Sequence, residues 1–261
     1  MKVAVITGAS SGIGLACAKK FAGNGYRVYS LSRRGGESKD IINLCCDVTD
    51  EKQVNETFKK IFETEGKIDV LVNNAGFGIS GAIEFTDEAQ AKKQFDVNFF
   101  GCFNCCKAVA HYMRKTGGGR IINISSMAAV LSIPFQAFYS ASKSAINSLT
   151  LALANELRPF GITVCALMPG DVKTSFTAVR EKETAGESVY GDTIKKSIAV
   201  MEHDEQNGMS PDRIADAVYR LSQKKNPKPV STTGAQYRLF AVLTKALPTS
   251  FANKIVSMIY T

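Results

Sequence analysis

Apolar runs alternate with amphipathic stretches along most of the chain, and this alternation predicts an α/β fold. Seven short runs are rich in apolar and β-branched residues, as buried strands are. They cover residues 2–7, 26–31, 41–46, 68–72, 120–125, 161–168 and 230–233. Between them, apolar positions recur at helical spacing. We therefore expect a doubly wound parallel sheet of about seven strands with helices on both faces.

Capping residues indicate where several helices begin. Thr49 or Asp50 can cap one helix, Thr86-Asp87 begins a long helical region, and Ser210-Pro211 begins a late helix. A length of 261 residues fits one large α/β domain or two small ones. Because the alternation is continuous and no low-complexity segment interrupts it, we expect a single domain over residues 1–261.

Two segments depart from this alternation. Residues 171–207 are polar, irregular in pattern and long for a connection, so we expect them to fold over the site as a lid. Residues 236–261 form an amphipathic tail, with apolar positions at Leu239, Phe240, Leu243, Leu247, Phe251, Ile255, Met258 and Ile259. Three roles for this tail are open: core packing or a substrate wall, a subunit contact, and weak docking on a membrane surface.

A glycine-rich turn between the first strand and the first helix indicates a phosphate-binding site. It reads Gly8-Ala9-Ser10-Ser11-Gly12-Ile13-Gly14. Glycines let the backbone approach a pyrophosphate closely, and the N-terminus of the helix supplies free N–H groups. In this position the turn predicts a dinucleotide cofactor on a Rossmann-like sheet.

A basic turn follows the second strand and bears on the choice of cofactor. Ser32, Arg33 and Arg34 stand where an NAD-preferring site usually has an acidic residue for the ribose 2′-hydroxyl. Arg33 can instead pair with a 2′-phosphate, because a guanidinium matches phosphate geometry. We expect NADP(H) as the preferred cofactor and NAD(H) as the alternative. The competing interpretation is a solvated basic turn.

The segment Phe138-Tyr139-Ser140-Ala141-Ser142-Lys143 contains the clearest catalytic candidates. Apolar positions at helical spacing follow it, so Tyr139 and Lys143 should share one face of a helix. The pKa of a free tyrosine is about 10, and a nearby ammonium lowers it by favouring the phenolate. A tyrosine tuned in this way can exchange a proton with a carbonyl or alcohol oxygen. The alternative is an ordinary surface pair.

Other polar residues occur where a ligand would lie. Ser125 and Ser126 end the fifth strand, and open α/β sheets bind ligands at the carboxyl ends of their strands. Asn98 lies inside the long helical region although asparagine is a poor helix former, so we expect its amide to have a specific partner. Asn73-Asn74-Ala75-Gly76 follows the fourth strand, and its small residues let a flat group lie against the backbone.

The net charge of +8 leaves several kinds of partner open. The basic residues form no stripe interleaved with aromatic residues, so we expect no nucleic-acid partner. No apolar run is long enough for a membrane span. The seven cysteines lack disulfide or metal spacing, and the first strand lacks a signal cleavage region. We expect free thiols, no metal and a cytoplasmic location.

Taken together, these motifs resemble the short-chain dehydrogenase/reductase family. The resemblance covers residues 2–174, and Ser126 precedes Tyr139 by the thirteen residues expected in that family. It rests, in chain order, on the glycine turn, Asn73-Asn74-Ala75-Gly76, Asn98, Ser126, Tyr139 with Lys143, and Pro169-Gly170-Asp171-Val172-Lys173-Thr174. Gly76-Phe77-Gly78 and residues 131–135 are similar to the branch of hydroxysteroid and retinol dehydrogenases.

The resemblance implies a role for each catalytic candidate. Tyr139 would be the general acid in reduction and the base in oxidation, and Lys143 would lower its pKa and hold the nicotinamide ribose. Ser126 would hydrogen-bond the substrate oxygen, and Asn98 would hold a water that links Lys143 to solvent. Ser126 is preferred to Ser125 because neighbouring residues on a strand point to opposite faces.

The resemblance also implies the cofactor contacts. Pyrophosphate would lie on the turn formed by Gly8, Ser10, Ser11, Gly12, Ile13 and Gly14. Adenine would contact Asp47 and Val48, and the adenosine ribose side would be lined by Asn74, Ala75 and Gly76. In the segment that begins with Pro169 and Gly170, Val172 would bond the carboxamide and Thr174 the phosphate or carboxamide.

We therefore expect an NADP(H)-dependent oxidoreductase that interconverts a secondary alcohol and a ketone or aldehyde. The expected substrate is an apolar small molecule of the hydroxysteroid, bile-acid or retinoid type. One alternative is a reductase of 3-oxoacyl thioesters, which the basic charge favours. Another is a catalytically silent NADP-sensing scaffold, which should have lost Tyr139, Lys143 or Ser126. Family members usually pair through the helix around residues 98–113 and the helix after Tyr139, so we expect a homodimer or homotetramer.

Overall fold

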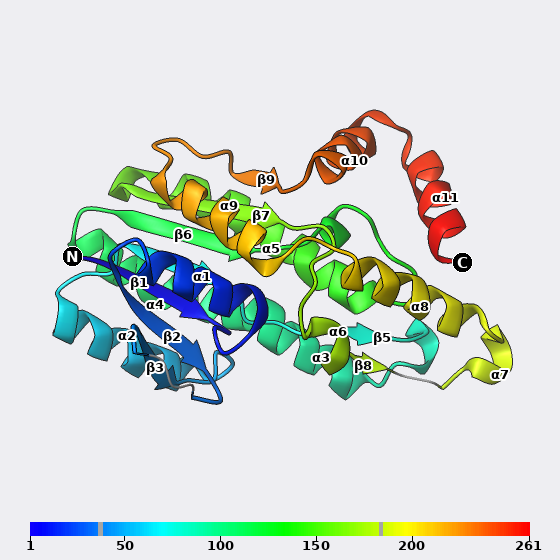
Figure 1. The fold of residues 1–261 in the computed structure, drawn as a ribbon, viewed down its shortest axis with the longest axis horizontal. Coiled ribbons are helices and arrows are strands. Elements are labelled where there is room, and N and C mark those ends of the chain that lie inside the picture. Colours follow the sequence, from blue (N-terminus) through cyan, green and yellow to red (C-terminus); the bar gives the residue numbers. More distant parts are fainter. Residues whose placement is uncertain (36–38, 183–184) are drawn as a thin grey trace.

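Seven parallel strands form the central sheet of the protein. The structure is a computed structural model that describes residues 1–35, 39–182 and 185–261. Over these residues the strand order is β3-β2-β1-β4-β6-β7-β9 (Figure 1). The strands are β1 (Lys2–Thr7), β2 (Tyr26–Ser32), β3 (Ile41–Cys45), β4 (Val70–Asn73), β6 (Gly119–Ile124), β7 (Ile162–Met168) and β9 (Val230–Thr232). This order confirms the expected doubly wound, Rossmann-like fold class.

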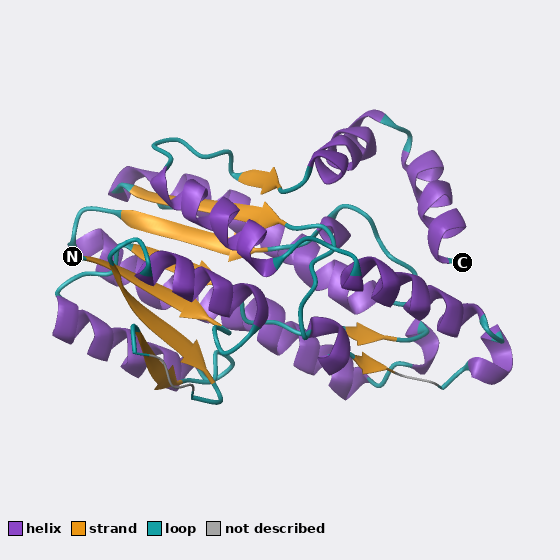
Figure 2. Ribbon diagram, in the orientation of Figure 1, coloured by secondary structure: helices purple, strands orange, loops and turns teal. Residues whose placement is uncertain are grey.

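Helices cover both faces of the sheet (Figure 2). Successive residues of a strand point to opposite faces, and in β1 this sends Val3 and Val5 into one buried cluster and Ala4 and Ile6 into another. The first cluster is closed by α2 (Glu51–Glu65), α4 (Gly101–Lys115) and α5 (Ala137–Glu156). The second is closed by α1 (Gly12–Ala22) and α9 (Pro211–Gln223).

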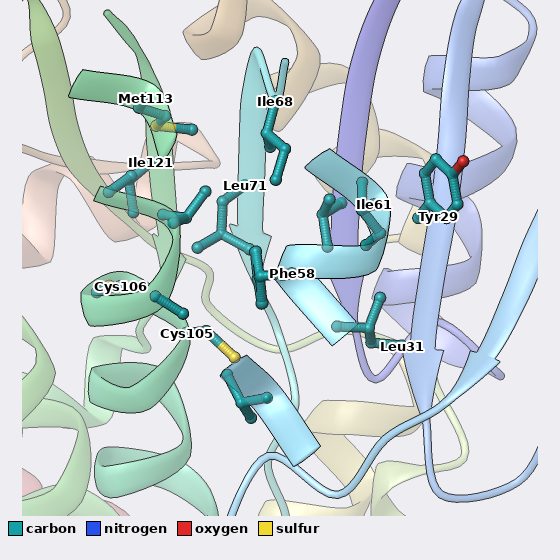
Figure 3. Close-up of a cluster of buried hydrophobic side chains, with 14 of the residues drawn as sticks. Tyr29, Leu31, Phe58, Ile61, Ile68, Leu71, Cys105, Cys106, Met113 and Ile121 are labelled. Atoms are coloured by element: carbon teal, nitrogen blue, oxygen red, sulfur yellow. The ribbon is translucent and has the colours of Figure 1, made fainter. Parts of the chain in front are cut away.

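Figure 3 shows the first cluster, in which Phe58 and Ile61 of α2 face Leu71 of β4. All three side chains are at most 1% exposed. Burial of large apolar side chains on this scale contributes about 1.5–3 kcal/mol for each residue. The cluster therefore anchors the sheet on which the site is built.

Three helices begin at expected caps. Asp50, rather than Thr49, caps α2 by accepting a hydrogen bond from the backbone N–H of Gln53 at 3.0 Å. Asp87 caps α3 (Glu88–Phe95), and Ser210 caps α9, which has Pro211 at its first position. These short side chains satisfy backbone N–H groups that have no partner within the helix.

The long helical region after Asp87 is not one regular helix. A π-helical turn over Asp96–Phe100 separates α3 from α4 and contains Asn98, which is fully buried. Such turns widen a helix by one residue and occur often at functional sites. Asn98, which is unfavourable inside a regular helix, thus lies where the regular α-helix is interrupted.

Residues 171–207 fold into short elements beyond the carboxyl edge of the sheet. They are α6 (Phe176–Val179), β8 (Glu181–Lys182), α7 (Glu187–Tyr190) and α8 (Thr193–Gln206), and residues 183–184 of the expected lid lie outside the described residues. β8 pairs with β5 (Ile79–Ser80) in a separate two-stranded sheet. Elsewhere in the chain, short 3₁₀ turns occur at Ile83–Phe85, Met127–Ala129 and Arg158–Phe160.

The amphipathic tail forms two helices, α10 (Ala235–Ala246) and α11 (Thr249–Tyr260), which project beyond the sheet (Figure 1). The break falls at Leu247-Pro248, where proline supplies no backbone N–H to continue the first helix. Within the described residues, no helix is both long enough and apolar enough to cross a membrane.

Candidate active site

Tyr139 and Lys143 lie one turn apart on α5, as their spacing predicts. The ammonium nitrogen of Lys143 is 5.7 Å from the centre of the Tyr139 ring and donates a hydrogen bond to the carbonyl of Ile124 at 2.9 Å. Ile124 is the last residue of β6, so this bond ties the helix to the carboxyl end of the sheet. The pair thus stands at the edge where parallel sheets bind ligands.

Burial controls the protonation of this pair. Desolvation raises the pKa of Tyr139 to about 12, against the lowering effect of a hydrogen bond with Ser126. Desolvation also lowers the pKa of Lys143 to about 8, because the side chain is only 5% exposed. The expected lowering of the Tyr139 pKa by Lys143 is not seen, since the ammonium bonds to the carbonyl of Ile124 and not to the phenol.

Ser125 and Ser126 follow β6 and point to different surroundings. The hydroxyl of Ser125 donates to the backbone carbonyl of Lys143 at 3.2 Å and holds α5 against the sheet. The hydroxyl of Ser126 bonds with Tyr139 and also accepts from the N–H of Ala128 at 3.1 Å. Ser126 is therefore the serine that the fold brings to the tyrosine.

Asn98 connects the π-helical turn to the segment after β4. Its amide oxygen accepts from the N–H of Phe77, and its amide nitrogen donates to the carbonyl of Phe77, both at 3.0 Å. The same nitrogen donates to the hydroxyl of Ser142 at 3.1 Å. A side chain on Gly76 would meet the Asn98 oxygen at 3.0 Å and the Lys143 nitrogen at 3.7 Å. Asn98 and Lys143 therefore flank one glycine.

The glycine turn is packed too closely for larger residues. A Cβ atom on Gly14 would lie 2.4 Å from the carbonyl oxygen of Gly8, and one on Gly8 would lie 2.9 Å from the Cα of Ala75. The amide of Asn74 donates to the carbonyls of Thr7 and Gly8, at 3.0 and 3.2 Å. Asn74 therefore supports the turn from behind.

A groove of about 150 Å³ runs over this turn toward Lys143. It is lined by Gly8, Ser11, Gly12, Ile13, Asn74, Ala75, Gly76, Ile124, Lys143, Thr174, Ser175 and Phe176. The N-cap of α1, Ser11, makes no capping bond with its side chain, and the first turn contains no acidic residue. The first N–H groups of α1 can thus bind an anion, so these residues fit the pyrophosphate of a dinucleotide.

Ser10, expected at the pyrophosphate, is exposed in the glycine turn. At the end of β2, where the 2′-phosphate is expected, the Ser32 hydroxyl donates to the carbonyl of Arg34. Arg33 and Arg34 are exposed at the end of β2.

Asp47 and Val48 follow β3. Asp47 accepts from the N–H and the hydroxyl of Thr49, at 3.0 and 2.8 Å. The side chain of Val48 packs on Gly101, and its carbonyl accepts from Asn104 at 3.0 Å.

The segment after β7 closes the other side of the groove. Pro169 accepts from the N–H of Met127 at 2.9 Å, and the ring of Tyr237 covers Gly170 so closely that no side chain would fit there. Val172 is buried and forms a bridge with Met209. Thr174 faces Gly12 across the groove, 3.4 Å from the position of a Cβ atom.

A larger cavity, of about 680 Å³, opens beside Tyr139 and Ser126. Its apolar walls come from the loop after β6, from α6 and from both tail helices. They include Leu131, Ile133, Phe176, Phe240, Leu243, Leu247, Ile255, Val256 and Ile259. The ring of Phe176 lies 5.6 Å from that of Tyr139. The arrangement places a hydroxyl pair at the end of an apolar cavity next to a phosphate-binding groove.

Charged residues of the segment 171–207 also reach this cavity, and the sequence pattern does not indicate this role. Asp171, Asp204 and Glu205 line it, and Glu205 forms an ion pair with Arg180, whose side chain is fully buried. Asp171 accepts from the hydroxyl of Tyr237 at 2.6 Å, and Asp204 lies close enough to Asp171 for its pKa to be raised by burial and by that charge. These contacts join residues far apart in the chain, so no local spacing predicts them.

Known proteins resemble this chain along most of its length. The short chain dehydrogenase family model matches residues 2–185. A 3-ketodihydrosphingosine reductase of Bacteroides thetaiotaomicron is 40% identical over 263 residues, 99% of this chain and 98% of that protein. The structure of ElxO with NADP bound has a TM-score of 0.76 at 29% identity, covering 91% of this chain and 99% of that one.

A second solved structure has a different cofactor. A short-chain dehydrogenase/reductase from Burkholderia phymatum in complex with NAD has a TM-score of 0.80 at 26% identity, covering 94% of each chain. A nicotinamide cofactor is thus supported for this fold and groove. The family model covers more than half of the chain, and the reaction of the family interconverts CH–OH and carbonyl groups. The protein therefore belongs to the short-chain dehydrogenase/reductase family, and it is an oxidoreductase.

Proposed function

We propose that this protein uses NADP(H) to reduce the ketone of a long-chain, apolar substrate to a secondary alcohol, and catalyses the reverse oxidation. One observation carries the proposal: Ser126 and Tyr139 stand at the end of a cavity of about 680 Å³ with apolar walls, beside the glycine-lined groove. An alcohol/carbonyl interconversion needs a hydride partner, a proton partner and a place for the substrate, and the three are adjacent here.

Each polar residue has a distinct part in this reaction. The nicotinamide would supply the hydride in reduction and accept it in oxidation. Ser126 would donate a hydrogen bond to the carbonyl oxygen and so stabilise the negative charge that develops there. Tyr139 would give that oxygen its hydroxyl proton, and the resulting phenolate is stabilised when the charged Lys143 lies near it.

Asn98 would hold other groups of the site in place, and Lys143 would act through where its ammonium group lies. Asn98 fixes the backbone of Phe77 and, through Ser142, the turn of α5 that carries Lys143. We propose that Lys143 turns from the carbonyl of Ile124 toward the ribose and the phenol once the groove is filled. Its buried environment weakens its hold on a proton, which makes its charge sensitive to such partners.

For the substrate we favour a long-chain 2-amino ketone of the 3-ketosphingoid type. The name of the Bacteroides relative describes such a substrate, and that relative aligns with 99% of this chain, including the tail that walls the cavity. Aliphatic side chains of α10 and α11 suit an alkyl chain, and Asp171 and Asp204 offer carboxylates to an amino group. The hydroxysteroid, bile-acid and retinoid substrates expected from the sequence also fit an apolar cavity.

The preference for NADP(H) is part of the proposal and rests on Arg33 and Arg34. Both are exposed beside the groove's adenosine end, and no acidic residue ends β2.

We also propose a homodimer. Family members usually pair through the helices that correspond to α4 and α5, and exposed apolar residues occur on both: Phe103 on α4, Phe100 just before it, and Leu151 on α5. The seven free cysteines, six of them buried, support a reducing, cytoplasmic location.

A substrate panel tests the proposal. NADPH oxidation is followed by absorbance with 3-ketodihydrosphingosine, a ketosteroid, retinal, a medium-chain aliphatic ketone and a 3-oxoacyl thioester. Fastest turnover of the sphingoid ketone supports the proposed substrate. Fastest turnover of the steroid or retinal would return the substrate to the polycyclic or retinoid class, and turnover of the thioester alone would favour the acyl-carrier reductase. Turnover of none, with NADPH bound, would favour the silent scaffold.

A further inference from the structure

The apolar side of each tail helix extends beyond the side chains that line the cavity. Next to the wall residues, Leu239 and Val242 of α10 and Phe251 and Met258 of α11 form an outer side, and these four are absent from the cavity walls. Their side chains are 59, 63, 53 and 78% exposed, in that order. The apolar stripe of a surface helix normally faces the interior of the protein, so the exposed outer side requires a separate explanation.

The two tail helices hold the main concentration of exposed apolar residues in the described chain. Eight of the seventeen large apolar side chains that are exposed there belong to α10 and α11, and four of these eight form the outer side while the other four line the cavity. Contiguous patches of this kind mark contacts with other molecules, whereas single exposed apolar residues are ordinary.

The same end of the chain carries almost the whole net charge. Residues 217–261 contain seven of the 32 lysines and arginines and none of the 24 aspartates and glutamates. The basic residues are Arg220, Lys224, Lys225, Lys228, Arg238, Lys245 and Lys254. Since the net charge of the chain is +8, the preceding 216 residues are nearly neutral. The net positive charge is therefore concentrated in residues 217–261.

These charges are available to a partner. Arg220, Lys224, Lys225, Lys228, Arg238 and Lys254 are exposed, and within the described residues none of the six forms an ion pair. After α9 the chain runs along one edge of the molecule, the upper edge in Figure 1, through β9 to α10 and α11. The basic loop before β9 and the apolar helices thus belong to the same edge.

The charge argues against a second copy of this chain as the partner of this surface. A twofold contact would place the same patch on both sides, and two patches with no acidic residue would repel each other. An anionic lipid surface offers both complements at once: phosphates for the basic residues and an acyl boundary for the apolar ones.

We propose that α10, α11 and the loop before β9 dock on an anionic lipid surface. Leu239, Val242, Phe251 and Met258 enter the boundary between headgroups and acyl chains, and the basic residues pair with lipid phosphates. Because the inner sides of the same helices wall the cavity, docking brings the cavity next to the lipid. An apolar substrate then passes from the bilayer to Tyr139 with little exposure to water.

Vesicle sedimentation tests this docking with the full-length protein. The probes are phosphatidylcholine vesicles and vesicles that also contain phosphatidylglycerol, each at low and high salt. We expect binding to the anionic vesicles only, weakened by salt, because salt screens the attraction between surface charges. Val242→Glu and Met258→Glu should each weaken binding about tenfold, and Lys254→Glu by a similar factor.

Matched substitutions elsewhere provide the controls. Val189 on α7 is 66% exposed, close to Val242 at 63%, so Val189→Glu should leave vesicle binding unchanged. Lys60, exposed on α2, provides Lys60→Glu as the control for Lys254→Glu. Circular dichroism and turnover of a short water-miscible ketone report whether each variant is folded, independently of any lipid substrate.

Two results would overturn the proposal: no sedimentation with either vesicle, and equal binding by wild type and by Val242→Glu. If wild type binds no vesicle and Val242→Glu also lowers the mass measured by light scattering, the surface joins two chains instead. Because sedimentation needs no turnover, a protein that docks but does not reduce sphingoid ketones would contradict the proposed substrate and leave the docking intact.

Discussion

The hydroxyl of Tyr139 is the residue-scale feature on which the proposed reaction depends. Burial makes the hydroxyl hold its proton firmly, since it raises the pKa to about 12. A proton donor of this kind delivers its proton only when the phenolate is stabilised as it forms. Ser126 and Lys143 can stabilise the phenolate, because both side chains lie close to Tyr139.

Removal of this hydroxyl should abolish the chemistry and leave binding intact. Tyr139→Phe keeps the ring that packs on Phe176 and loses the proton donor, so kcat should fall by about 10²–10⁴. NADPH binding, measured by fluorescence, should be unchanged. Tyr112→Phe is the control, because Tyr112 stacks on Phe62 away from the site. Turnover retained in Tyr139→Phe would remove Tyr139 as the proton donor.

Lys143 should make stability depend on pH in a characteristic direction. Its pKa is lowered from 10.5 to about 8 in the folded protein. Between these values the unfolded chain binds more protons than the folded one, so the contribution of Lys143 to the free energy of unfolding rises with pH, by up to about 3 kcal/mol. Below pH 8 both states hold the proton and the contribution is least favourable.

Urea denaturation measures this effect. Wild type should gain stability relative to Lys143→Met as the pH is raised from about 8 to about 10, the window below the raised pKa of Tyr139. Lys60→Met, at an exposed position, is the matched removal of one ammonium. Parallel curves for wild type and Lys143→Met over this range would show that Lys143 holds its proton equally in both states.

Arg33 should decide between the two nicotinamide cofactors. If it pairs with the 2′-phosphate, Arg33→Ala should raise KM for NADPH by about 10–100-fold and change KM for NADH little. Steady-state kinetics with both cofactors provide the measurement. Arg34→Ala should have the smaller effect of the two. Equal changes with NADPH and NADH would rule out Arg33 as the basis of the preference.

At the scale of elements, one buried ion pair joins α6 to α8 within residues 171–207, the expected lid. Arg180 lies between the ring of Phe176, at 5.7 Å, and the carboxylate of Glu205 on α8. Thr177 also donates to Glu205, at 2.5 Å. These contacts hold α6 against α8, and α6 carries the phenylalanine that contacts Tyr139.

Breaking this pair on one side should destabilise the protein. Arg180→Met leaves the carboxylate of Glu205, which is 15% exposed, without its cation, so we expect a loss of about 3 kcal/mol. The double variant Arg180→Met, Glu205→Gln should recover part of this loss. Lys92→Met removes an exposed ion pair with Glu88 and should have little effect. Denaturation of Arg180→Met that matches Lys92→Met would show that the pair does not anchor the lid.

At the scale of the whole molecule, opposite regions of the surface suit different partners. The basic edge with α10 and α11 carries the proposed lipid contact. The helices α4 and α5 carry the proposed subunit contact, with Phe103 and Leu151 exposed by 38 and 48%. If both assignments hold, the dimer would present its cavities to a membrane without using the tail for pairing.

A charge placed on α5 should separate the subunits. Leu151→Glu would bury a carboxylate in an apolar contact, so the mass measured by light scattering should fall to that of one chain. Val189→Glu, at an exposed valine on α7, should leave the mass unchanged. A wild-type protein that already elutes as a monomer, or a Leu151→Glu dimer, would contradict pairing through this helix.

The sequence by itself determined the seven strands of the central sheet, most of the helices and the family. Apolar runs and period-3.6 patterns are local, and these strands follow them to within about two residues. The family is confirmed by a match over residues 2–185. Tyr139 with Lys143, and the glycine turn, also depend on residues close together in the chain, so their arrangement was predictable. The roles assigned to them stay predictions.

Only the tertiary structure decided what surrounds these residues. Residues more than twenty positions apart form the Arg180–Glu205 pair, and the two tail helices wall a cavity that begins at Tyr139. The pKa of Tyr139 is raised because burial outweighs the effect of neighbouring charges in this structure. The four-residue spacing of Tyr139 and Lys143 gives no information about burial. Local pattern specifies the elements, whereas the environment of each group depends on how distant elements pack together.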